Sequence, residues 1–518
     1  MPSRMWARRS KARLRSVLVQ IVAGGEQDVG TAVDTGEEVR VPLPSGLRAL
    51  LPDQVLAGST SSAGSQELVV RRARAEDEKT LERVMHYVFA MAGDPDGPTF
   101  NELLGMDESQ VSADATWGAF AGDTAVSQLL AHPWVLGGAN AGCGMAAVSG
   151  VGTLPEFRRL GLLRTMMAML FRDMQSKGQA IAALGATQAA IYQRYGYAEA
   201  VRDVRSHSID TVDIAFVDGD PGGCTVTRRE VNDELKEIMR PLYEQFIDGR
   251  CCAVGWDGAA GDDWSSPHNM LFFEVPDALR EKHASEFSRG THAAVATNEL
   301  GEPRGYCVYQ MESGWGKGSG TASHPTRNQK INVRQFIWAD TDAYRSMLSF
   351  FAKHDLVGEV NLQSLPSDDP ASTLLLEPRL LRTKVHEGSW WRIVDVIGAL
   401  QSRMYDSYSS LLQQSPGLAS TLRLAVMDDE RLAPWNIGTF LLKLNCDGTA
   451  TVSKLKQAEG SSAEVSVGIR ALALLWAGTN SARELSSWQH LTAVDDAALA
   501  KVDMMFATKR APFCFHGW

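Results

Sequence analysis

Short runs of apolar residues mark the buried strands of this chain. They predict strands over 67–72, 125–131, 145–153 and 180–184. Apolar residues three or four positions apart predict helices over 76–92 and 162–177. Gly178 closes the second helix, and the next strand follows at once. This succession of strand, loop, helix and strand is typical of an α/β or α+β fold.

The same alternation continues more loosely to the end of the chain. Further strands are predicted over 306–311, 335–338, 359–362, 440–446, 449–454 and 465–467. Further helices are predicted over 342–353, 469–476 and 497–505. The Gly- and Ser-rich stretch 313–323 is expected to be a mobile hairpin tip, whereas Asp447-Gly448 predicts a tight hairpin turn.

The length of 518 residues favours several domains, at about 150 residues for each. Small polar residues at 59–65 are typical of a linker, and no amphipathic period precedes them. We therefore predict a disordered N-terminal extension over 1–66. Folded domains are predicted over 67–225, 226–408 and 409–518. The aromatic residues that end the sequence predict a tail that docks on the protein.

Neither of two apolar stretches has the pattern of a targeting or membrane segment. The segment 17–22 follows a basic start, but it is short and has no clean small-residue cleavage site. A tail or a misassigned start codon explains it at least as well as a signal peptide. The stretch 124–155 has no charged residue, but polar residues, glycines and a proline interrupt it well before about 20 apolar residues are reached.

Composition narrows the class of protein. Hydrophobic residues make up 44% and charged residues 22%, which excludes wholly disordered, collagen-like and coiled-coil proteins. The net charge of −11 disfavours nucleic acid and anionic membranes as partners and favours a cation. The seven cysteines are scattered without a C-x-x-C spacing, and the eleven histidines show no ligand spacing. We expect a cytoplasmic protein without a metal.

The start of the predicted helix 162–177 carries the first candidate site. Arg158, Arg159 and Arg164 surround Gly161 there. The first backbone N–H groups of a helix lack partners, the helix dipole adds positive charge, and a glycine allows close approach. This pattern predicts a site for an anion of pyrophosphate type. The alternative is a solvated basic helix start without a ligand.

Two further segments are candidates for the same chemistry. Gly152, between Val151 and Thr153, lies in a predicted strand, where a glycine often marks a bulge or a close approach. The amides of a pantetheine arm could pair with that strand edge, although an irregular strand end is the alternative. Tyr192 is one of three nearby tyrosines, whose hydroxyls could protonate a leaving thiolate. From spacing alone, a core aromatic is the more common role.

Four ordered segments resemble the Eis ("enhanced intracellular survival") family of GNAT acetyltransferases. They read PEFRRLGLLR at 155–164, AIYQRYGY at 190–197, GSWWRIVDV at 388–396 and PFC at 512–514. The resemblance extends over 67–518 and implies an active GNAT domain, a degenerate GNAT domain and a sterol-carrier-protein-like α+β domain. It also implies a homo-hexamer. After Trp338-Ala339-Asp340 no Gly-rich basic turn appears, which independently predicts a second domain without cofactor.

The resemblance also implies acetyl-CoA as the co-substrate and assigns roles to residues. Val151, Gly152 and Thr153 would hold the pantetheine, and Thr187 and Gln188 would line the thioester end. Tyr192 matches the family's general acid, and the carboxylate of the final residue, Trp518, matches its general base. The residues implied for the pyrophosphate are Arg158, Arg159, Leu160, Gly161, Leu162, Leu163 and Arg164.

The sequence departs from the family pattern at positions that affect the pocket. A Ser-Glu pair of the relatives is replaced by Thr187-Gln188, a terminal Phe by Trp518, and one of three arginines by Leu160. We expect an acetyl-CoA-dependent N-acetyltransferase acting on a small cationic amine such as an aminoglycoside, a polyamine or a lysine side chain. The alternatives are a non-catalytic lipid or ligand carrier and an acyltransferase for longer acyl chains. Tyr192 and the intact Arg158–Gly161 turn favour catalysis, because a scaffold needs neither.

Overall fold

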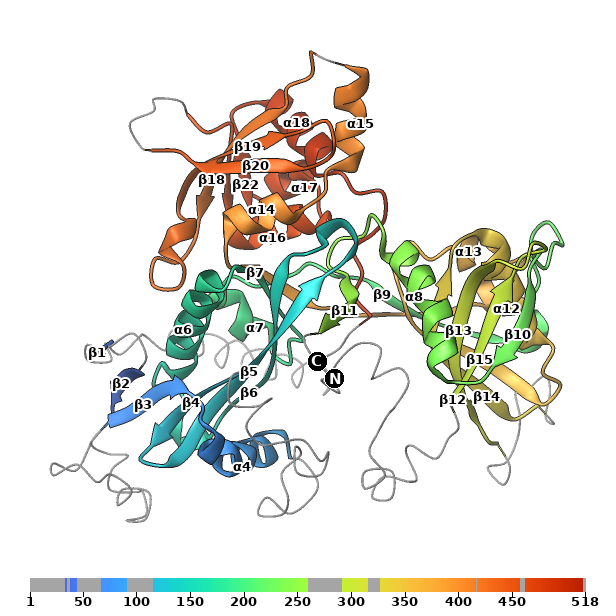
Figure 1. Cartoon of the computed structure of the whole chain (residues 1–518), viewed down its shortest axis with the longest axis horizontal. Coiled ribbons are helices and arrows are strands. Elements are labelled where there is room, and N and C mark those ends of the chain that lie inside the picture. Colours follow the sequence, from blue (N-terminus) through green and yellow to red (C-terminus); the bar gives the residue numbers. More distant parts are fainter. Residues whose placement is uncertain are drawn as a thin grey trace, which may run out of the picture.

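The computed structural model describes residues 33–34, 38–43, 67–90, 115–259, 291–314, 327–415, 417–456 and 462–515. Within these ranges the strands form three sheets, each partly covered by helices (Figure 1). Each of the three sheets contains one parallel pair of strands among antiparallel neighbours, namely β6–β7, β14–β15 and β18–β21. The fold is therefore mixed α+β throughout the described chain.

The first sheet belongs to the unit drawn in blue to green in Figure 1. Its strand order is β1-β2-β3-β4-β5-β6-β7-β17-β8, and β11 also pairs with β5. The strands are β1 (Val33–Asp34), β2 (Glu38–Pro42), β3 (Glu67–Arg72), β4 (Thr116–Ala121), β5 (Thr124–Leu136), β6 (Gly144–Thr153), β7 (Gln179–Leu184), β8 (Ala198–Glu199), β11 (Val254–Ala259) and β17 (Trp390–Ile393). The helices are α4 (Glu78–Phe89), α6 (Leu162–Ser176) and α7 (Ala189–Tyr192).

The second sheet has the order β10-β12-β13-β14-β15-β9-β16. Helix α12 covers one face and α8 the other, because each shares a separate core cluster with that sheet. The strands are β9 (Val204–Asp210), β10 (Thr225–Arg229), β12 (Thr291–Thr297), β13 (Pro303–Glu312), β14 (Gln329–Trp338), β15 (Val357–Leu365) and β16 (Arg382–His386). The helices are α8 (Asp233–Ile247), α12 (Thr341–Ala352) and α13 (Ala371–Leu374).

The third sheet, orange to red in Figure 1, has the order β20-β19-β18-β21-β22. Helix α16 is apolar except for the exposed Arg470, and most of it is buried because it packs against both this sheet and strands β8 and β17 of the first. The strands are β18 (Thr421–Met427), β19 (Gly438–Leu444), β20 (Ala450–Lys454), β21 (Val465–Gly468) and β22 (Leu491–Ala493). The helices are α14 (Val396–Ser402), α15 (Asp406–Gln414), α16 (Ile469–Ala477), α17 (Ala482–Ser487) and α18 (Asp496–Phe506).

The central strands of the first sheet are buried on both faces. On one face, Ala146 and Ala182 pack with the apolar side of α6. On the other face, Ala147 and Ala183 share a core cluster with the third unit. This arrangement explains why the paired parts of these strands, 145–148 and 180–184, are continuous apolar runs, as is typical of parallel strands covered on both faces. The first and third units therefore share one hydrophobic interior.

The predicted elements match the structure well, but the predicted domain limits do not follow the sheets. Strand β2, inside the N-terminal extension predicted to be disordered, pairs antiparallel with β3. Strand β9 lies in the predicted first domain but belongs to the second sheet, whereas β11 and β17 return to the first. Local patterning predicts that a segment is a strand but not which strand it pairs with. The pairing of strands across the predicted domain limits was therefore missed. Most of the predicted tip 313–323 lies outside the described residues.

No helix within the described ranges is long and apolar enough to cross a membrane. The uncharged stretch 124–155 forms β5 and β6, joined by a turn, as predicted.

Candidate active site

Strands β6 and β7 separate at the position predicted to hold a pantetheine arm. Their parallel pairing runs from Gly144 to Val148, where it reaches Leu184 at the end of β7. Strand β6 continues to Thr153 but pairs there only with β5. Gly150 and Val151 together face a single residue of β5, and Gly150 has a φ of 56°. This bulge turns the end of β6 away from β7 and leaves an edge of backbone amides beside the split.

The end of β6 is fixed by contacts that sequence patterns did not reveal. The Ser127 hydroxyl donates to the Gly152 carbonyl at 2.9 Å and lies 2.7 Å from the Thr153 hydroxyl. Arg158 Nε donates to the Thr153 carbonyl at 3.2 Å. A Cβ on Gly152 would lie 3.3 Å from the methyl groups of Val88 in α4. The absent side chain of Gly152 therefore allows close packing against α4, and its predicted contact with a pantetheine arm stays a prediction.

The start of α6 has the geometry of an anion site. No side chain caps this helix, and its N-cap residue is Gly161, with a φ of 77°. A Cβ built on Gly161 would meet no atom within 4 Å, so the space in front of it is open. Arg159 also has a positive φ, of 65°. Two left-handed residues ahead of uncapped N–H groups form the kind of concave backbone that binds phosphate.

The side chains of the predicted pyrophosphate segment divide into two groups. Arg158 and Arg159 are exposed and can reach an anion, whereas the Leu162 side chain is buried in the core. Leu160 and Leu163 pack against that core. These three leucines can therefore serve an anion only through their backbone. Arg164 differs from the other arginines, because its Nη1 donates to Asp429 Oδ2 of the third unit at 3.1 Å.

The tyrosine segment lies beside this helix start. Val151, Leu160, Leu163 and Tyr195 pack around the same core cluster that contains Tyr192. Burial raises the pKa of the Tyr195 hydroxyl, and the nearby charge of Arg164 offsets part of this rise. The end of β6, the start of α6 and Tyr192 at the end of α7 therefore all contribute side chains to one core cluster.

Tyr192 is 5% exposed, and burial raises the pKa of its hydroxyl. A hydrogen bond with Thr187 acts in the opposite direction and lowers this pKa. The Tyr197 ring contacts the Tyr192 ring edge to face, with centroids 6.1 Å apart. Thr187 and Gln188 are themselves exposed ahead of α7. Tyr192 is therefore protonated at neutral pH, which suits a proton donor and not a base.

Trp518 lies outside the described residues, so the predicted role of its terminal carboxylate stays a prediction. The chain before it leaves α18 and docks, as predicted, between the first and second units (Figure 1). Phe513 N–H donates to the Cys251 carbonyl at 3.2 Å, and Phe513 and Phe515 pack against Phe246 of α8.

Models of protein families match each of the three units. A GNAT acetyltransferase domain matches residues 69–200, a second one matches 275–393, and a sterol carrier protein domain matches 396–515. The N-acetyltransferase Eis of Mycobacterium tuberculosis is 25% identical over 70% of this chain and 78% of its own length. The chain is a GNAT N-acetyltransferase of Eis type.

Other relatives agree with this assignment. An uncharacterized N-acetyltransferase of Streptomyces avermitilis is 26% identical, over 80% of this chain and 92% of its own length. The crystal structure of Eis1 from Mycobacterium abscessus has a TM-score of 0.64 at 21% identity and covers 87% of this chain and 100% of its own. A GCN5-related N-acetyltransferase from Anabaena variabilis gives a TM-score of 0.66 at 18% identity, with the same coverage.

The two GNAT domains of this Eis-type protein differ where a phosphate would bind. Helix α12 of the second domain follows a strand as α6 does, but its N-cap is Asp340, whose carboxylate accepts from Ala343 N–H at 2.9 Å. A hollow of about 540 Å³ beside it is lined by Asp340, Asp342, Glu299 and Glu302 among others. The Asp340 carboxylate closes the helix start, and the carboxylates around it disfavour phosphate. The prediction of two GNAT domains followed by a sterol-carrier-protein-like domain is confirmed, and the prediction that the second one binds no cofactor agrees with this acidic helix start but stays a prediction.

A metal site is not apparent in the described parts of this enzyme, where no three His, Cys, Asp or Glu side chains gather to hold an ion.

Two residues near the α6 start were missed from the sequence: Ser127, which fixes the end of β6, and Asp429, which binds Arg164. Asp429 stands 265 positions from its partner. Its only sequence signal is the acidic pair Asp428-Asp429 directly after a strand.

Proposed function

We propose that this protein transfers the acetyl group of acetyl-CoA to a primary amine of a cationic acceptor, such as an aminoglycoside, a polyamine or a lysine side chain. The observation that carries the proposal is the start of α6, which is uncapped, opened by Gly161 and flanked by Arg158 and Arg159, beside a buried and protonated Tyr192. The net charge of −11 supports a cationic acceptor, because it draws positive ligands towards the protein.

The residues of the first domain fit the parts of acetyl-CoA. The backbone at Gly161 and the guanidinium groups of Arg158 and Arg159 would hold the pyrophosphate. The amide edge of β6 at Val151, Gly152 and Thr153 would pair with the pantetheine amides, which would bring the thioester near Thr187 and Gln188. The bound molecule supplies an activated acetyl group, and the protein supplies position and proton transfer.

The reaction is a direct transfer. The amine nitrogen forms a bond to the acetyl carbon while the carbon–sulfur bond breaks. Tyr192 gives its proton to the departing sulfur, and the carboxylate of Trp518 accepts a proton from the amine. A carboxylate at a chain end has a pKa near 3.5 in water, so this role needs an apolar surrounding that raises the value.

The proposal is tested by thiol release from acetyl-CoA over a panel of amines. We expect the variant Y192F to lose about 100-fold or more in kcat with unchanged acetyl-CoA affinity, because only proton donation is removed. Y195F is the matched control, since Tyr195 is a half-buried tyrosine three positions along the chain, and it should keep most of the activity. A variant without Trp518 should also lose kcat. Full activity in both Y192F and the shortened chain would refute the assigned roles.

Two further properties follow from the likeness to Eis and stay proposals. Sedimentation of the full chain would test the expected homo-hexamer. The same assay with acyl-CoA esters of increasing chain length would separate an acetyltransferase from a longer-chain acyltransferase.

A further inference from the structure

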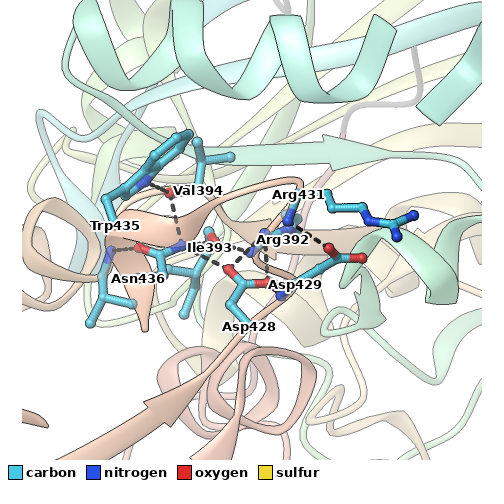
Figure 2. Close-up of polar contacts among 9 residues, drawn as sticks. Arg392, Ile393, Val394, Asp428, Asp429, Arg431, Trp435 and Asn436 are labelled. Carbon is cyan, nitrogen blue, oxygen red and sulfur yellow. Dashed lines mark hydrogen bonds and ion pairs between the residues drawn. The ribbon is translucent and has the colours of Figure 1, made fainter. Parts of the chain in front are cut away.

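A loop of the sterol carrier protein domain reaches the start of α6. This loop, residues 428–437, connects β18 to β19 and contains a short helical turn at Pro434–Asn436 (Figure 2). Leu432 is 1% exposed and belongs to the same core cluster as Leu162 and Met166 of α6. Trp435 packs against that cluster from its edge. The loop therefore completes the hydrophobic core of the catalytic GNAT domain.

A buried ion pair fixes the first end of the loop. Asp428 accepts two hydrogen bonds from Arg392 Nη2, at 3.0 and 2.8 Å, and the two side chains are 0% and 2% exposed for Arg392 and Asp428. The Arg392 guanidinium also stacks over Phe171 of α6 at 4.9 Å. Figure 2 shows Arg392 and Asp428 facing each other where β17 ends. Since both charged groups are buried away from water, moving either one away would leave the other buried without a counter-ion.

Hydrogen bonds fix the other end of the loop. Asn436 Nδ2 donates to Asp428 Oδ2 at 2.9 Å and to the Val394 carbonyl at 3.0 Å. The Trp435 indole N–H donates to the same carbonyl at 2.8 Å. Asn436 Oδ1 accepts from Val396 N–H at 3.0 Å. The loop is therefore anchored at both ends to the chain that leaves β17.

Asp429 stands between these anchors. Its backbone N–H donates to Asp428 Oδ1 at 2.8 Å, and its own Oδ1 accepts from Arg431 N–H at 2.8 Å. Its Oδ2 accepts from Arg164 Nη1 at 3.1 Å, and both side chains are 33% exposed. An ion pair this exposed is easily broken, but the carboxylate cannot move far because its loop is fixed.

We propose that Asp429 sets the affinity of the enzyme for acetyl-CoA by competing with its pyrophosphate for Arg164. This inference rests on the proposed function, in which the start of α6 holds the pyrophosphate. Two anions that share one guanidinium repel each other. The anchored Asp429 carboxylate therefore lowers the affinity for acetyl-CoA below the value that the start of α6 would give without it. By linkage, bound acetyl-CoA weakens the contact of Asp429 with Arg164 to the same extent.

The variant D429N tests this competition. The amide keeps the shape of the side chain and can still accept from Arg431 N–H, but it has no charge. We expect the dissociation constant for acetyl-CoA, measured by titration calorimetry on the full chain, to fall about threefold to tenfold. The gain should shrink at high salt, because screening weakens repulsion between exposed charges. KM for acetyl-CoA should fall in parallel, while kcat changes less.

Three comparisons make the test specific. E430Q removes the same charge from the neighbouring exposed residue, and it should leave the affinity unchanged. Acetyl-pantetheine, a donor without phosphate, should show the same kcat/KM in D429N and wild type. In the R164Q background, D429N should lose most of its effect.

Several outcomes would overturn the proposal. An equal or weaker acetyl-CoA affinity in D429N, an equal gain in E430Q, or an equal gain with acetyl-pantetheine would each do so. A full gain in the R164Q background would show that Asp429 does not act through Arg164. If the wild type neither binds nor turns over acetyl-CoA, the proposed function fails and takes the inference with it. That result is seen in the wild type alone and is distinct from the others.

Discussion

Arg392 Nη2 donates to both carboxylate oxygens of Asp428, at 3.0 and 2.8 Å, and this ion pair joins strand β17 of the catalytic domain to the sterol carrier protein domain. Both side chains are buried, and the Asn436 amide shares the carboxylate. Gly196 lies against the same arginine, because a Cβ there would come within 2.9 Å of its side chain. The two domains are therefore joined by charges that water cannot reach as well as by a shared apolar core.

Removing one charge of this pair should destabilise the protein strongly. We expect D428N to cost about 3–5 kcal/mol, because it leaves the Arg392 guanidinium buried without its counter-ion. Differential scanning calorimetry or urea unfolding followed by tryptophan fluorescence would measure the loss. E377Q is the control, since it breaks an exposed pair with Arg379 and should change little. A D428N protein as stable as E377Q would show that the buried pair contributes nothing.

Substitution of Gly161 tests the cofactor site, because its effect on stability through backbone strain can be separated from its effect on acetyl-CoA affinity. G161A places a side chain at a φ of 77°, which costs about 1–2 kcal/mol of stability, and it fills the open space in front of the helix start. The dissociation constant for acetyl-CoA should rise by about tenfold or more, measured by calorimetry.

The matched control for this prediction is G178A at the other end of the same helix. Gly178 has a φ of 71°, and a Cβ there also meets no atom within 4 Å. Both variants should lose similar stability, but only G161A should lose affinity. Equal affinities in the two variants would argue against the start of α6 as the pyrophosphate site.

Local sequence patterns predicted the helices and strands because residues close together in the chain determine where these begin and end. The predicted strand 67–72 coincides with β3, and the predicted helix 162–177 differs from α6 by one residue at its end. The uncapped start of that helix could also be read from the sequence, since Gly161 precedes it and no Ser, Thr, Asp or Asn stands there. These features depend only on near neighbours in the chain.

The remaining features depend on distant parts of the chain. The motif containing Trp390 and Trp391 supports the family resemblance, but nothing in it predicts a strand inserted between β7 and β8. The pairing of Arg164 with Asp429 joins residues 265 positions apart. Charge patterns cannot select one carboxylate among many, because the choice is made by the packing of two domains. Of the two missed residues, Ser127 comes from a neighbouring strand of the first sheet and Asp429 comes from the third domain.

The stability of the enzyme should fall as the pH rises above about 10. Burial raises the pKa of Tyr309 to about 12 and raises those of Tyr243, Tyr306 and Tyr344 well above their ordinary value. Between the ordinary and the raised values the unfolded chain has lost protons that the folded chain retains. Stability therefore decreases with pH in this window, and it is fully present below it. Thermal midpoints recorded together with tyrosinate absorbance would check this, and complete tyrosinate formation in a folded protein near pH 10 would contradict it.

The last prediction concerns the segment before the C-terminal residues. Asp368 of the second GNAT domain accepts from Arg250 Nη1 at 2.9 and 3.1 Å and from Ala511 N–H at 3.1 Å. Arg250 also donates to the Ala511 carbonyl at 2.9 Å, so the two side chains hold the tail from both sides. The degenerate domain, whose own helix start is closed by Asp340, thus serves to position the tail.

If the tail carries the proton acceptor of the reaction, loosening this anchor should reduce turnover without touching the cofactor site. We expect D368N to lower kcat by about tenfold or more, because misplacement of a reacting group by a small distance is costly. The affinity for acetyl-CoA should not change, and hydrogen exchange of residues 510–515 should quicken. D355N, which removes an exposed carboxylate of the same domain, is the control. Faster exchange with full turnover would mean that the docked tail has no part in the transfer.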